Sequence, residues 1–180
     1  MSKKKENTSK LSGEDMEEIL NSPDKLKLYL DTNILIAYLD KSHKFNYEAA
    51  SIIEPLKDRE CWFFVNTIVV GEFIDQWRKL KKVSINNSIH TLINFMDNVL
   101  KHCLRGGSPI NLDHVFSSYK KHSKHTKLLK VPFNDFLILN EAESIKNIKV
   151  ITCDHGMFSA GKNILKKNIY YLPFKTKKGK

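Results

Sequence analysis

Four acidic residues stand at places where a folded chain could bring their carboxylates together. Asp31 follows the apolar run "LKLYL" and Asp154 follows "VITC", so each ends a stretch typical of a buried strand. Glu72 and Asp135 fall near the beginnings of two helical patterns, "TIVVGEFIDQWRKL" and "PFNDFLILNEAESIK". Clustered carboxylates repel one another, so they need a shared proton or a bound cation to remain compatible. The arrangement therefore raises the question of a metal site.

Oxygen ligands alone suit hard cations such as Mg²⁺ or Mn²⁺, which often keep several waters and bind substrate phosphates. Such a cation can lower the pKa of a bound water and stabilise charge on a phosphodiester during in-line attack. Asn33 and Thr152 lie two residues from Asp31 and Asp154, and could orient a water, a phosphate or an acid. The chemistry to expect from such a cluster is phosphodiester hydrolysis.

Each acid taken alone also has a simpler explanation. Asp31 could cap the helix that follows it, Glu72 could be a solvated helix residue, and Asp154 could belong to an ordinary turn. Asp135 resists such an explanation, because helical spacing places it on the buried face with Ile138, Leu139 and Ala142. The cluster hypothesis thus depends on all four acids meeting.

Alternating strand and helix patterns predict parallel β-α units, and so an α/β fold. Strands are expected at 27–30, 61–65, 109–112, 150–154 and 169–174. Helices are expected at 33–40, 46–57, 67–80, 84–102, 113–122 (with Asp113 as its cap) and 132–146. Strand carboxyl ends and the amino ends of the following helices share one edge of a parallel sheet, where ligands bind. This topology would bring the four acids to that edge.

The length of 180 residues suits one domain, expected at 25–174. Residues 1–24 form a polar tail with at most a short helix at Glu14–Leu20, and 175–180 form a basic tail. A net charge of +10 favours a polyanion such as nucleic acid, although lysines that only maintain solubility explain it equally well.

The sequence predicts a cytoplasmic protein without a membrane partner. No apolar run approaches the length of a membrane span, and the first residues lack the apolar segment of a secretory signal. The three cysteines are widely spaced and odd in number, which fits neither a disulfide framework nor a zinc ribbon.

At these motifs the chain resembles the PIN-domain nucleases, especially the VapC-like toxin ribonucleases. The resemblance runs through "LDTNILIAYLD", "VVGEF", "NDFLILNEAE" and "VITCDHGMF", in that order, and covers roughly Leu26 to Phe174. It implies a three-layer sandwich around a mostly parallel five-stranded sheet, and Mg²⁺- or Mn²⁺-dependent cleavage of RNA. It also implies the catalytic acids Asp31, Glu72, Asp135 and Asp154. We expect Asp31, Asp135 and Asp154 to be the metal ligands, directly or through water.

Two departures bear on the toxin role more than on the chemistry. His155 and Gly156 follow Asp154, where many relatives carry another acid or small polar residue, and the tail and the loop before Pro132 are long. The expected partners are RNA and, for a toxin, an antitoxin protein, with a homodimer also considered. Two alternatives stay open: a PIN-like module that binds RNA or protein without cutting, and a DNA-directed structure-specific nuclease.

The basic stretch "KKHSKHTKLLK", Lys120 to Lys130, leads into the helix that carries Asp135. Lysines there would hold an RNA backbone without reading its sequence. The candidate phosphate contacts are Lys121, Lys124 and Lys127. Lysines for solubility are the competing explanation.

Overall fold

The computed structural model describes residues 26–57, 61–100, 104–105, 112–122 and 131–172. The two expected tails, the short helix at Glu14–Leu20 and the loop lysines Lys124 and Lys127 lie outside these ranges. Within them, no helix combines the length and the apolar character needed to cross a membrane.

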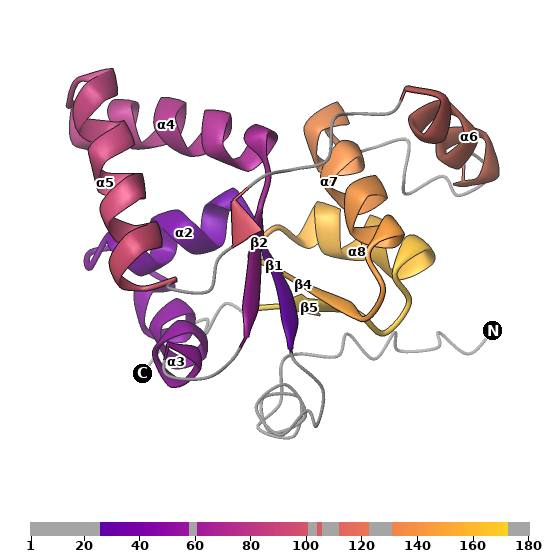
Figure 1. The fold of residues 1–180 in the computed structure, drawn as a ribbon, viewed down its shortest axis with the longest axis horizontal. Coiled ribbons are helices and arrows are strands. Elements are labelled where there is room, and N and C mark those ends of the chain that lie inside the picture. Colours follow the sequence, from indigo (N-terminus) through magenta and orange to yellow (C-terminus); the bar gives the residue numbers. More distant parts are fainter. Residues whose placement is uncertain (1–25, 58–60, 101–103, 106–111, 123–130, 173–180) are drawn as a thin grey trace, which may run out of the picture.

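A parallel sheet forms the centre of the fold (Figure 1). The strands lie in the order β3-β2-β1-β4-β5, and every neighbouring pair is parallel. Their bounds are β1 Lys27–Leu30, β2 Trp62–Val65, β3 Leu104–Arg105, β4 Ile148–Thr152 and β5 Ile169–Tyr171. Four strands form the body of the sheet, and the two-residue β3 extends one edge. The predicted α/β class is confirmed.

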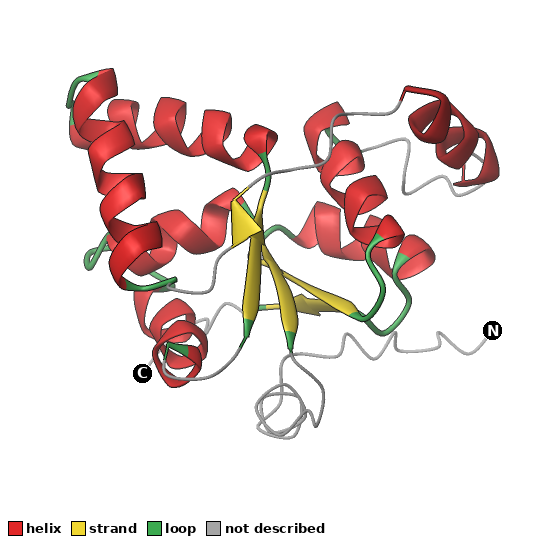
Figure 2. Ribbon diagram, viewed as in Figure 1, coloured by secondary structure: helices red, strands yellow, loops and turns green. Residues whose placement is uncertain are grey.

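Helices cover both faces of this sheet (Figure 2). One layer holds α2 Thr32–Leu39, α3 Asn46–Leu56, α4 Thr67–Lys81 and α5 Ile85–Asn98. The other holds α6 Leu112–His122, α7 Phe133–Ser144 and α8 His155–Ile164. Figure 1 shows α6 beyond α7, at the margin of the molecule. β1 runs through the middle of the core, where Leu28, Tyr29 and Leu30 are fully buried.

The chain between 100 and 122 differs from the prediction. Leu112, expected to end a strand at 109–112, begins α6 instead, while 109–111 are not described. The edge strand lies at Leu104–Arg105, which pairs with Phe64 and Val65 of β2. Two residues carry no periodicity of their own, so only pairing with β2 defines this strand. Asp113, expected as a cap, lies inside the first turn of α6, where its charge favours the helix N-terminus.

Helix α8 was not predicted. Its sequence, "HGMFSAGKNI", contains two glycines and several polar residues, which are poor helix formers. Burial offsets this weakness, because Met157 and Phe158 lie in the core. Gly161 is required by packing, since a Cβ at this position would clash with Ile169 and Leu139. Tertiary contacts therefore stabilise α8 more than local propensity does.

Candidate functional site

The side chain of Asp31 does not cap the helix that follows it. Asp31 is the N-cap residue of α2, yet its carboxylate makes no capping hydrogen bond. Its Oδ2 instead accepts hydrogen bonds from Thr152 Oγ1 at 2.7 Å and from Asn33 Nδ2 at 3.3 Å. The side chain is held in a buried place at the end of β1, where 3% of the residue is exposed.

Thr152 connects the ends of two neighbouring strands. Its fully buried hydroxyl donates to Asp31 and accepts a hydrogen bond from the backbone N–H of Asp154 at 2.8 Å. Asp154 does what was considered for Asp31, since its Oδ1 caps α8 by accepting from the Met157 N–H at 2.8 Å. Among the described residues, no group donates a hydrogen bond to Asp154 Oδ2. Capping therefore leaves one oxygen of Asp154 available to a ligand.

Glu72 is more than a solvated residue of α4. Its Oε2 accepts from the buried Thr32 Oγ1 at 3.0 Å, and its Oε1 accepts from Asn134 Nδ2 at 2.6 Å. The carboxylate thus joins α4 to the first turns of α2 and α7. Sequence reasoning missed Thr32 and Asn134, although each stands next to a predicted acid.

Asp135, in the first turn of α7, is a partly buried carboxylate that makes no hydrogen bond or ion pair with any other described residue. Burial, and then repulsion from Asp31, Asp154 and Glu72, raise its pKa to about 7. Burial also raises the pKa of Asp31 to about 6, against the hydrogen bonds from Thr152 and Asn33. The four predicted acids therefore lie close enough to interact electrostatically, at the edge where β1 and β4 end.

Among the described residues, no basic side chain pairs with an acid of the cluster. In the described part of the chain, the ion pairs of Lys, Arg and His do not involve any of the four acids. Oxygen-only ligands with unbalanced negative charge fit Mg²⁺ or Mn²⁺. No three acidic, His or Cys side chains of the described residues are positioned to hold a metal ion together. A cation held by Asp31, Asp135 and Asp154 would need water molecules among its ligands, as Mg²⁺ commonly has.

A partly buried carboxylate ties together the elements that carry the acids. Glu141 of α7 accepts from Tyr29 of β1 at 3.0 Å, and Asn66 Nδ2 donates to the same Oε2. Asn66 also caps α4, because its Oδ1 accepts from the Val69 N–H at 2.9 Å. Glu141 of α7 thus connects β1, which leads to Asp31, with Asn66, which caps the helix that carries Glu72. The sequence analysis singled out neither Asn66 nor its distant partner Glu141.

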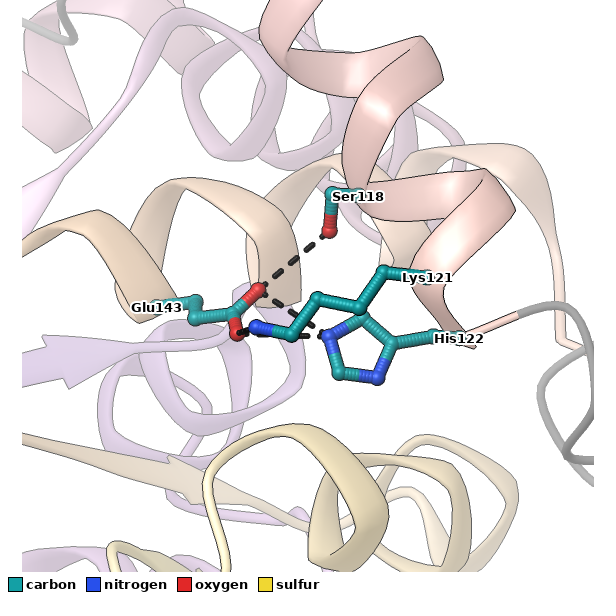
Figure 3. A network of polar contacts seen from close by, with 4 residues as sticks. All are labelled: Ser118, Lys121, His122 and Glu143. Atoms are coloured by element: carbon teal, nitrogen blue, oxygen red, sulfur yellow. Dashed lines mark hydrogen bonds and ion pairs between the residues drawn. The ribbon is translucent and has the colours of Figure 1, made fainter.

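Two other residues considered in the sequence, Lys121 and Cys153, are not part of this acidic cluster. Lys121 Nζ forms an ion pair with Glu143 at 2.6 Å (Figure 3). Cys153, next to Asp154, is buried, and burial raises the pKa of its thiol to about 12, so it is no nucleophile at neutral pH.

An open groove of about 480 Å³ lies between α2 and α4. Its lining residues are Asn33, Ile36, His43, Gln76, Lys79 and Leu80. Because Asn33 is hydrogen-bonded to Asp31, one part of the groove adjoins the acidic cluster.

Comparison with one solved structure supports the fold, and a second is more distantly similar. The crystal structure of VapBC2 from Rickettsia felis bound to a DNA fragment from their promoter contains a similar chain, with a TM-score of 0.57 and 17% identity. The similarity covers 82% of this chain and the whole of the matched one. FitAcB from Neisseria gonorrhoeae is similar over 79% of this chain and 96% of its own, with a TM-score of 0.48 and 17% identity. Neither a protein-family model nor a curated protein sequence matches the chain.

Proposed function

We propose that this chain is a Mg²⁺- or Mn²⁺-dependent endoribonuclease that hydrolyses RNA phosphodiester bonds. One observation carries the proposal: Asp135 lacks a hydrogen-bond donor or cation among the described residues while three other carboxylates act on it. A fold without a function for this cluster would gain by replacing or pairing such an acid, since uncompensated buried charge is costly. The resemblance to PIN-domain nucleases, at the same four acids, supports the assignment.

The side chains divide the work according to their surroundings. Asp31 is buried, and hydrogen bonds from Thr152 and Asn33 hold its carboxylate in one orientation at the site. Asp135 has a pKa of about 7 without metal, and a bound cation would lower it, so this carboxylate would act as a ligand of the cation. A bound divalent cation would lower the pKa of an attacking water and neutralise charge developing on the phosphate. Glu72, held between Thr32 and Asn134, keeps α4 and α7 together at the site.

A toxin role within a toxin–antitoxin pair is the biological setting that we propose for this activity. Support comes from the resemblance of the four motifs to VapC-like toxins and from the similar fold of a chain in VapBC2, which is seen bound to a DNA fragment from its promoter. For this chain, the proposed partners are RNA as substrate and an antitoxin protein as inhibitor. Growth arrest on expression, relieved by a gene encoded beside it, would test this setting separately from the chemistry.

The chemistry is tested with purified protein and a single-stranded RNA, with and without Mg²⁺, Mn²⁺ and chelator. Asp31→Asn and Asp154→Asn should each abolish cleavage while circular dichroism stays unchanged. Asp75→Asn is the matched control, since Asp75 is an exposed acid of α4 that pairs only with Arg78 and Lys79 among the described residues. Full activity in either site variant, or equal activity in chelator, would overturn the proposal.

Two further arms separate the alternatives. A DNA strand of the same sequence should not be cut, and cutting of structured DNA in preference to RNA would favour the structure-specific nuclease. Tight RNA binding without cleavage under every metal condition would favour the non-cutting module. Mn²⁺ binding followed by electron paramagnetic resonance gives a readout independent of turnover.

A further inference from the structure

Glu141 of α7 is a carboxylate whose two hydrogen-bond donors are buried and distant in sequence. Its Oε2 accepts from the Tyr29 hydroxyl at 3.0 Å and from Asn66 Nδ2. Tyr29 is fully buried, and Asn66 is 4% exposed. Without Glu141 both donors would lack this acceptor in the core, and a buried donor without a partner is costly. The two bonds join α7 to β1 and to the residue that follows β2.

These donors lie beside the place where the acidic cluster forms. Tyr29 stands two residues before Asp31, whose backbone continues the extended conformation of β1, so both side chains face the same side of the sheet. Asn66 follows β2, the parallel neighbour of β1, in the same extended conformation. Burial, and then the negative charges of Glu141 and Asp31, raise the pKa of Tyr29, so its hydroxyl keeps its proton at neutral pH and remains a donor.

A second hydrogen bond holds α7 nearer its beginning. Asn134 Nδ2 donates to Glu72 Oε1 of α4 at 2.6 Å. Asn134 precedes Glu141 by about two helical turns, so the two side chains leave α7 on the same side. Glu72 belongs to α4, and Asn66 caps this helix. Because α4 and α7 belong to opposite layers (Figure 1), the two bonds span the edge of the sheet where β1 and β2 end.

The place of Asp135 depends on the place of α7. Asp135 makes no hydrogen bond or ion pair with another described residue, so no contact of its own carboxylate determines its distance from Asp31. Apolar packing of Phe136 and Ile138 holds α7 on the sheet, but such packing is not directional. Hydrogen bonds depend on angle as well as distance. The bonds of Glu141 therefore fix how α7 is turned and how far it lies along β1.

We propose that Glu141 is a positioning residue of the acidic site, which holds α7 so that Asp135 meets Asp31 at the separation that one divalent cation requires. The inference rests on the proposed metal-dependent nuclease function, and adds a residue that acts through Asp135 rather than by touching the cation. Its loss should weaken binding of the cation, while cleavage should recover at a high cation concentration because the acids themselves are unchanged.

The test measures Mn²⁺ binding to the full chain without RNA, by electron paramagnetic resonance, beside urea denaturation and cleavage across a Mn²⁺ series. Glu141→Gln should raise the Kd for Mn²⁺ about tenfold. Tyr29→Phe changes no charge and should raise the Kd by less, because Asn66 still donates to Glu141. Glu143→Gln is the matched control: it removes a carboxylate from the same helix, but one whose bonds lead to α6, and it should leave the Kd unchanged.

An exchange of the two side chains separates position from charge. In the double variant Asn66→Asp with Glu141→Gln, the amide and the carboxylate change places and the net charge equals that of the parent. A hydrogen bond between the two positions can form again with donor and acceptor reversed, and an aspartate oxygen can still cap α4. The Kd for Mn²⁺ should return most of the way to the parent value. If Glu141→Gln alone does not fold, Tyr29→Phe and this double variant decide the question.

Several results would overturn the inference, and they separate it from the proposed function. If Asp31→Asn abolishes Mn²⁺ binding while Glu141→Gln and Tyr29→Phe only lower the urea midpoint, Glu141 supports the fold alone and the metal site stands. An equal rise in Kd for Glu143→Gln would make lost charge the cause. Cleavage that stays low at saturating Mn²⁺ would show that Glu141 does not act through Asp135. Absence of Mn²⁺ binding to the parent chain would overturn both proposals.

Discussion

Thr152 Oγ1 lies 2.7 Å from Asp31 Oδ2, across a sequence separation of 121 residues. The same hydroxyl accepts the backbone N–H of Asp154 at 2.8 Å. A single side chain of β4 therefore sets the distance between two of the four acids. Its role cannot be taken over by an apolar residue of the same shape, since the buried Asp31 would lose its closest donor.

Replacing Thr152 by Val should therefore harm both activity and stability. Cleavage should fall about 10- to 100-fold, as when the partner of a metal-binding carboxylate is removed. The free energy of unfolding should fall by about 1–3 kcal/mol, because the Asp31 carboxylate stays buried without that donor. Thr152→Ser should restore most of both. The control is Thr91→Val on α5, which removes a hydroxyl that donates to Asn87 O. Equal losses of activity and stability in this control would contradict the prediction.

The metal-free protein should lose stability as the pH rises. In the folded state the pKa of Asp31 is about 6 and that of Asp135 about 7, above the value near 4 of an unfolded aspartate. Between pH 4 and 7 the folded state binds more protons than the unfolded state, so the free energy of unfolding declines across this window. Urea denaturation in chelator at several pH values measures the slope.

Asp31→Asn should flatten that slope between about pH 4 and 6, since Asn carries no titrating proton. Mg²⁺ or Mn²⁺ should raise stability at pH 7.5, where the carboxylates are most ionised, by an amount that grows with cation concentration. A control buffer without divalent cations, brought to the same ionic strength with Na⁺, distinguishes binding of Mg²⁺ or Mn²⁺ from general screening of the carboxylates. The pKa assignments would be contradicted if, in chelator, the free energy of unfolding rose between pH 5 and 7. An Asp31→Asn variant with the same pH dependence as the parent would also contradict them.

Asn134 should matter for activity and not for stability. Asn134→Ala removes the hydrogen bond to Glu72 Oε1 from an exposed position, so unfolding should change by less than about 0.5 kcal/mol. Cleavage should fall by about tenfold, because Glu72 is then free to turn away from the site. Asn98→Ala, an exposed asparagine on α5, is the matched control. A variant as active as the parent would show that Glu72 needs no support from α7.

Glu143→Gln should loosen α6 without unfolding the domain. Lys121 loses its ion pair and Ser118 and His122 lose a charged acceptor, so amide protons of α6 should exchange faster while those of β1 and β4 keep their protection. The cost should be about 1 kcal/mol, because Gln can keep part of the hydrogen bonding and the Lys121 partner is exposed. Glu54→Gln on α3, which breaks the ion pair with Lys57, is the control. Unchanged exchange across 112–122 would mean that Glu143 does not hold α6.

The α/β class, the parallel arrangement and the region of the acids could be predicted from the sequence, because strand and helix periodicity is local. β1 and α4 illustrate this: "KLYL" and the stripe of Val69, Phe73 and Trp77 are visible within a few residues. The same local view could not choose between capping and clustering for Asp31. It offered capping as one explanation for Asp31 and a turn for Asp154, whereas the Asp154 side chain caps α8 and the Asp31 side chain does not cap α2.

Features that depend on distant partners could not be predicted. β3 exists through its pairing with β2, and α8 through burial against β5 and α7, so neither has a strong pattern. The contacts Glu72–Asn134 and Glu141–Asn66 join residues 62 and 75 positions apart. Polar side chains of this kind have no periodicity, and only the fold determines which of them meet.

The central place of β1 has a consequence for how the protein is made. Asp31 is translated early, but its neighbours in the sheet on one side, β4 and the hydroxyl of Thr152, come more than a hundred residues later. A ribosome-bound chain that ends before β4 therefore has the first acid and lacks the strand that orients it. Contacts so distant in sequence are slow to form, because closing a long loop costs entropy. An unfinished chain would accordingly lack the proposed nuclease activity while it is still close to the ribosome that is making it.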